Sequence, residues 1–75
     1  MNVSIKYCSE WNYLPYASSV EKELNEAFSD IRVQLIPGHG GVFEVTLDDR
    51  LIYTKSDTGR FPNAGEIAGI INKAI

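Results

Sequence analysis

The sequence has few of the residues and segments that mark several large protein classes. Cys8 is the only cysteine among 75 residues, so no internal disulfide can form. Small extracellular domains usually carry several disulfides, and we therefore expect a reducing, cytoplasmic location. No apolar run approaches the roughly 20 residues of a spanning helix, and residues 1–6 lack the basic and apolar segments of an export signal. We expect neither a membrane span nor export.

Positive charge is also scarce. The chain has 7 lysine and arginine residues against 10 aspartate and glutamate residues, which gives a net charge of −3. Nucleic-acid affinity comes largely from neutralised phosphates, so we expect no nucleic-acid partner, and for the same reason no anionic membrane. Cys8 and His39 supply at most two protein ligands where a structural zinc needs four. We expect no metal site and no cofactor.

The rest of the composition is that of an ordinary globular protein. Hydrophobic residues make up 44% of the chain and charged residues 23%, a balance that is too apolar for disorder. Seventy-five residues can enclose only one modest core. We expect residues 1–75 to form a single domain that depends on packing for its stability.

Hydrophobic periodicity predicts six elements in the order β-α-β-β-β-α. Alternation of apolar and polar residues predicts strands at residues 2–7, 31–35, 43–47 and 50–54. An apolar stripe at helical spacing predicts a helix from Leu14 to Phe28, with Pro15 in its first turn. Asn63 and Glu66 have the spacing of a capping box, which predicts a second helix ending near Ala74. The segment 55–62, which lies between the strand at residues 50–54 and this second helix, is expected to be a polar loop.

This order predicts an α/β protein with a four-stranded mixed sheet and two helices. A strand-helix-strand crossover makes the first two strands parallel, and the hairpin that follows adds two antiparallel strands. The first, second and fourth strands should then end at one edge, where loops 8–13, 37–41 and 55–62 converge. Ligands of open α/β sheets usually bind at that edge.

Three short motifs lie in or beside these loops. Tyr7-Cys8 is followed by Ser9-Glu10 and then by Asn12-Tyr13, and further motifs occupy residues 40–45 (GGVFEV) and 59–62 (GRFP). In this order and spacing the motifs resemble the selenoprotein W-related family (SelT/SelW/SelH, or Rdx) over nearly the whole chain. The resemblance implies a thioredoxin-like two-layer sandwich and a role in cell redox homeostasis.

The sequence departs from the family's redox motif at one position. That motif is Cys-x-x-Cys or Cys-x-x-selenocysteine, and Trp11 stands at its second reactive position. An intramolecular dithiol cycle is therefore excluded. What remains is chemistry with a single thiol, in which Cys8 forms a mixed disulfide with glutathione or with a protein thiol. Whether the chain is a monothiol oxidoreductase stays open at this stage.

Cys8 and His39 each have two interpretations. A free thiol is mostly protonated at neutral pH, so a nucleophilic Cys8 needs a positive neighbour. His39 is the candidate activator because its loop shares the edge, and Lys6 is a weaker one. The plainer interpretation makes Cys8 a small buried hydrophobe and His39 a solvated loop residue. The redox hypothesis requires a Cys8 thiol that solvent can reach.

The aromatic residues at the same edge support a different class of function. We define the Trp11 edge as the residues Trp11, Tyr13, Gly40, Gly41 and Phe61. Aromatic side chains are common anchors in protein interfaces, so this edge predicts a redox-inactive module that binds a protein partner. In the plainer interpretation the tyrosines only cover the start of the first helix and Phe61 belongs to the core.

Overall fold

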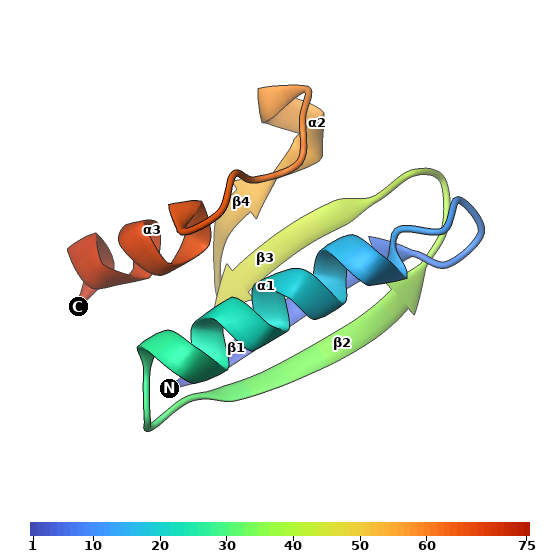
Figure 1. The fold of residues 1–75 in the computed structure, drawn as a ribbon. Coiled ribbons are helices and arrows are strands. Elements are labelled where there is room, and N and C mark those ends of the chain that lie inside the picture. The colour runs from blue at the N-terminus through green and yellow to red at the C-terminus, as the bar shows by residue number, and fades with distance from the viewer.

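The computed structural model describes residues 1–75 and contains four strands and three helices (Figure 1). In chain order the elements are β1 (Asn2–Cys8), α1 (Leu14–Ala27), β2 (Arg32–Gly38), β3 (Phe43–Leu47), β4 (Arg50–Thr54), α2 (Lys55–Thr58) and α3 (Glu66–Ala74).

The strands form one sheet in the order β2-β1-β3-β4. Ile5 of β1 pairs in parallel with Leu35 of β2 and antiparallel with Val45 of β3. β3 and β4 form the hairpin, with a bulge beside Val45 and Thr46. The predicted mixed sheet and its strand directions are confirmed.

Both long helices pack on one face of the sheet, which makes a two-layer structure (Figure 1). The core contains side chains from the inner face of the sheet together with α1 and α3 residues: Val3, Ile5, Phe43, Val45, Leu47, Tyr53, Ala17, Val20, Leu24, Ile67 and Ile71. The opposite face has no helix over it. Residues that alternate with the core positions, such as Ser4 and Thr46, belong to that open face.

The helix α1 follows its sequence pattern closely. Ala17, Val20 and Leu24 recur every three or four residues and are buried, and full burial of a large aliphatic side chain contributes about 1.5–3 kcal/mol. Pro15 occupies the first turn, where its missing N–H costs nothing. The helix ends where the Phe28 N–H donates to the Leu24 carbonyl. None of the helices combines the length and apolar character that crossing a bilayer requires.

One prediction about the carboxyl-terminal third was wrong. The predicted polar loop 55–62 begins with the short helix α2, so the sheet carries three helices rather than two. The Thr54 Oγ1 accepts from the Ser56 N–H to start α2, and Gly59 ends it with φ +73°. The predicted contact between Asn63 and Glu66 forms, since the Asn63 N–H donates to the Glu66 carboxylate. The helix α3 itself begins at Glu66, after Gly65 with φ +80°.

Candidate functional site

The three loops at the carboxyl edge of the sheet converge as expected. The Cys8 N–H donates to the Val42 carbonyl over 2.8 Å, and the Ser9 N–H donates to the Gly38 carbonyl over 3.0 Å. These bonds hold the end of β1 between β2 and the start of β3. The third loop contributes Lys55, which lines a groove together with Trp11. Residues distant in sequence therefore meet at this edge.

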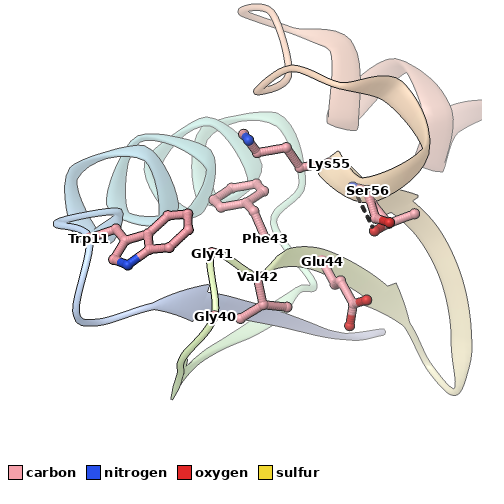
Figure 2. A pocket seen from close by; sticks show the side chains of 9 residues that line it. Trp11, Gly40, Gly41, Val42, Phe43, Glu44, Lys55 and Ser56 are labelled. Carbon is pink, nitrogen blue, oxygen red and sulfur yellow. Dashed lines mark hydrogen bonds between the residues drawn. The ribbon is translucent and has the colours of Figure 1, made fainter.

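The groove between these loops has a volume of about 430 Å³. Trp11, Phe43 and the Lys55 side chain lie on one side of β3, and Glu44 points away on the other side (Figure 2). The complete lining is Trp11, Gly40, Gly41, Val42, Phe43, Glu44, Thr54, Lys55 and Ser56. A ligand in this groove would meet two aromatic rings, a glycine backbone and the positive charge of Lys55, with the Glu44 carboxylate towards the other side of β3.

Trp11 is held in place although it is exposed. Its side chain is 60% exposed, and its ring lies against Gly41, where a Cβ atom would overlap the indole. Gly41 also has φ +80°, a conformation that favours glycine. Tyr13 meets the indole edge-on, with ring centroids 6.1 Å apart. The ring is therefore positioned by the fold and still available for contact.

Phe61 connects Trp11's neighbours to the core. The ring of Tyr16 stacks on it at 3.8 Å, Tyr13 meets it edge-on at 4.7 Å, and Phe43 of the core meets it edge-on at 5.3 Å. Phe61 is half-buried and packs against the core cluster from outside. Because Tyr13 also touches Trp11, the aromatic rings form a continuous chain from the core to the groove.

Solvent does not reach the Cys8 thiol, although the redox hypothesis requires a thiol that it can reach. Cys8 is a free cysteine with 0% exposure. Its carbonyl accepts from the Tyr13 N–H over 3.3 Å, which closes the turn of residues 8–13. Together with the bonds to Val42 and Gly38, this turn fixes the chain on both sides of the sulfur. The thiol therefore has no exposed surface that a partner could reach.

His39 follows Gly38, the residue that pairs with Cys8 in the sheet, but it makes no hydrogen bond to Cys8. His39 is exposed. It lines a second hollow of about 430 Å³ together with Lys6 and Glu44, and Cys8 is not part of that lining. No group of three or more histidine, cysteine, aspartate or glutamate side chains is arranged to hold a metal ion.

Lys55 is the charged groove residue on the Trp11 side of β3 that the sequence does not single out. Its Nζ atom lies 5.8 Å from the centroid of the Tyr13 ring and 5.5 Å from that of Phe61, within the range of cation–π attraction. A signal was present in the sequence, because Lys55 directly follows the strand that ends at this edge. The hydrophobic pattern places it in a polar loop and does not show what its charge faces.

An ion pair anchors the loop that carries Phe61. Arg60 donates two hydrogen bonds to the Glu66 carboxylate, over 2.7 and 3.0 Å. The Arg60 hydrogen bonds, and then the Asn63 N–H that donates to the same carboxylate, lower the pKa of Glu66 to about 2. The Tyr53 hydroxyl donates to the Arg60 carbonyl. Phe61 is thus fixed from both neighbouring segments.

Comparison with known proteins identifies a family and similar solved structures. The model of the Rdx family matches residues 2–73. A selenoprotein W-related protein from Vibrio cholerae has a crystal structure that superposes with a TM-score of 0.92 at 28% identity, covering 97% of this chain and 94% of that one. A crystal structure of a Bordetella parapertussis protein gives 0.91 at 26% identity, covering 99% and 96%.

A curated relative is longer than this chain. Mouse migration and invasion enhancer 1 is 27% identical over 78 residues, an alignment that covers 99% of this chain but 64% of the mouse protein. The structural matches confirm the expected thioredoxin-like fold, and the family match spans nearly every residue. This chain therefore belongs to the Rdx family and has a thioredoxin-like fold.

Proposed function

We propose that this chain binds an extended peptide segment of a partner protein through the Trp11 edge, without a dithiol redox cycle of its own. One observation carries the proposal. At the family's second reactive position stands a side chain that is 60% exposed, while the remaining thiol has 0% exposure. The residue that a partner meets first is therefore an aromatic anchor rather than a sulfur.

The arrangement of Trp11 favours binding energetically. Tryptophan is among the residues most often found to dominate interface energies. Because the ring already rests on Gly41, a ligand that packs on its free face orders little that was mobile, and preorganisation of this kind raises affinity. Leu14 and Tyr16, 45% and 49% exposed, add exposed apolar surface at the start of α1, where the Tyr16 ring meets Tyr13 edge-on.

The groove suits a segment better than a whole folded surface. Its volume of about 430 Å³ lies within the range of about 300–1,000 Å³ for pockets that hold small ligands. A few residues of extended chain fill such a space. The larger contact area of a folded partner would then lie outside the groove, on Leu14 and Tyr16.

A displayed library of random peptides, selected on the immobilised full chain, tests this proposal. We expect peptides whose binding is lost in Trp11→Ala and kept in Leu51→Ala. Leu51 is a matched control because it is 55% exposed and does not line the groove. Enrichment of no peptide, or of peptides that lose binding in Leu51→Ala and keep it in Trp11→Ala, would contradict the proposal.

Family membership supports a second candidate function, chemistry at the single thiol. The Cys8 thiol would first lose its proton to solvent, and the thiolate would attack one sulfur of glutathione disulfide. A Cys8–glutathione disulfide forms, and the other glutathione leaves as a thiolate that takes up a proton from solvent. The structure around the buried thiol would have to open first.

The rate of this exchange separates the two candidates. Mass spectrometry can follow addition of one glutathionyl group to the native chain and to the chain in denaturant. The thiol candidate predicts rates within about tenfold of each other. If the buried thiol reacts only when the structure rarely opens, the rate in the native chain should be at least roughly a hundredfold lower than the rate in denaturant. That result favours the binding module.

A further inference from the structure

The backbone around Lys55 is fixed by several hydrogen bonds. Thr54 caps the start of α2 through its Oγ1, which accepts from the Ser56 N–H over 3.2 Å. The Gly59 N–H donates to the Lys55 carbonyl over 2.8 Å, and the Thr58 hydroxyl donates to the Thr54 carbonyl over 3.3 Å. The side chain of Lys55 therefore leaves the sheet edge in a defined direction.

That direction places the ammonium group over aromatic rings. Lys55 is half-buried, and its Nζ atom lies over Tyr13 and Phe61. Tyr13 in turn touches Trp11. The aromatic chain that positions the anchor therefore also positions a positive charge beside it, on the same side of β3 (Figure 2).

The charge of Lys55 has no carboxylate partner. The ion pair of this chain joins Arg60 to Glu66. Glu44 lines the same groove, but it points to the other side of β3 (Figure 2), where Lys6 is its cross-strand neighbour. A cation without a counterion can pair with a carboxylate of a ligand, and the attraction between charges near a protein surface is stronger than in bulk water.

We infer that the groove selects an acidic peptide segment, in which a carboxylate pairs with Lys55 while an adjacent apolar side chain packs on Trp11. This inference rests on the proposed function and names its ligand class. The net charge of −3 does not oppose it at physiological ionic strength, because exposed charges more than about 8 Å from the ligand are largely screened.

The peptides selected in the library experiment provide the probe. We expect aspartate or glutamate in the enriched sequences, next to an apolar residue. Each selected peptide is then synthesised a second time with asparagine or glutamine in place of the acid. Wild-type protein should bind the acidic form at least about tenfold more tightly than the amide form, a discrimination typical of a charged hydrogen-bonded pair.

Three variants at lysine positions test whether Lys55 causes the preference for the acidic form of the peptide. In Lys55→Gln the two peptide forms should bind alike, whereas Lys55→Arg should keep the preference for the acid. Lys22→Gln is the control, since Lys22 is an exposed residue of α1 outside the groove. It should behave as wild type does.

The outcomes also distinguish a failure of this inference from a failure of the proposed function on which it rests. Peptides that need Trp11 but contain no acid, or an acid preference that persists in Lys55→Gln, overturn the inference and leave the proposed function standing. If no selected peptide depends on Trp11, both are overturned. Folding of each variant is checked by circular dichroism before binding is measured.

Discussion

The indole ring of Trp11 lies against the backbone of Gly41 so closely that a methyl group at position 41 would overlap it. Two loops that are 30 residues apart in sequence are thereby joined at the groove. Gly41 combines this contact with a φ of +80°. Gly40 beside it also has a positive φ, +72°, but faces open space. Substitutions at these two neighbouring glycines therefore distinguish the effect of a positive φ from the effect of the ring contact.

We predict that Gly41→Ala destabilises the chain more than Gly40→Ala does. Both variants place a side chain at positive φ, which costs about 1–2 kcal/mol. Only Gly41→Ala also collides with the ring, and overpacking adds about 1–3 kcal/mol. Urea denaturation measures the difference, and emission of Trp11, the only tryptophan, should change in Gly41→Ala alone. The extra loss should vanish when Trp11→Ala is combined with each variant; if it persists, the ring contact is not its cause.

The missing second thiol can be restored. We predict that Trp11→Cys forms an intramolecular disulfide with Cys8 on mild oxidation, because the substitution recreates the Cys-x-x-Cys spacing within a turn closed by the bond from Tyr13 to Cys8. Thiol titration in denaturant should find two thiols before oxidation and none after it. Dimers linked between chains, with no internal bridge, would contradict the expected geometry of the turn.

Glu23 connects the two long helices. Its carboxylate accepts from the Gly65 N–H over 2.8 Å and from the Ala68 N–H over 3.1 Å, at the start of α3. A carboxylate in this position satisfies free N–H groups and faces the positive end of the helix. We predict that Glu23→Ala lowers the free energy of unfolding by about 1–2 kcal/mol. Glu26→Ala, on the exposed side of the same helix, should change it little, and equal losses would show that Glu23 does not act as a cap.

The Arg60–Glu66 pair predicts a dependence of stability on pH. The folded-state pKa of Glu66 is lowered from 4.5 to about 2, first by the Arg60 hydrogen bonds. The unfolded chain therefore binds a proton at Glu66 at higher pH than the folded chain does. The stabilisation is present above pH 4.5 and is lost as the pH falls towards 2. Urea midpoints of wild type should fall more steeply than those of Glu66→Gln across this interval, and parallel curves would contradict the assignment.

Much of the fold follows from local patterns, and the site follows less. The strands and α1 were predictable because their alternation and helical spacing are set by which face is buried. The short helix α2 has too few residues to show a period, and it depends on the Thr54 cap. The start of α3 depends on a carboxylate 42 residues away in sequence, Glu23 bonded to Gly65, which no local pattern contains.

The site residues divide in the same way. Convergence of the three loops followed from strand direction alone, and so did the presence of Trp11 at the edge. The burial of Cys8 did not, because it depends on how loops distant in sequence pack around the end of β1, where the Cys8 N–H donates to the Val42 carbonyl and the Ser9 N–H donates to the Gly38 carbonyl. The role of Lys55 depends on where Tyr13 and Phe61 meet in space, and their positions in the sequence do not indicate this contact.

Binding of a selected peptide to Cys8→Ala and to Trp11→Ala decides whether this chain acts through its surface or through its thiol. Both variants are compared with wild type by fluorescence anisotropy of a labelled peptide, at a temperature where circular dichroism shows each to be folded. We predict that Cys8→Ala binds within about threefold of wild type and that Trp11→Ala binds at least about tenfold more weakly. Loss of binding in Cys8→Ala with binding retained in Trp11→Ala would contradict the proposed function.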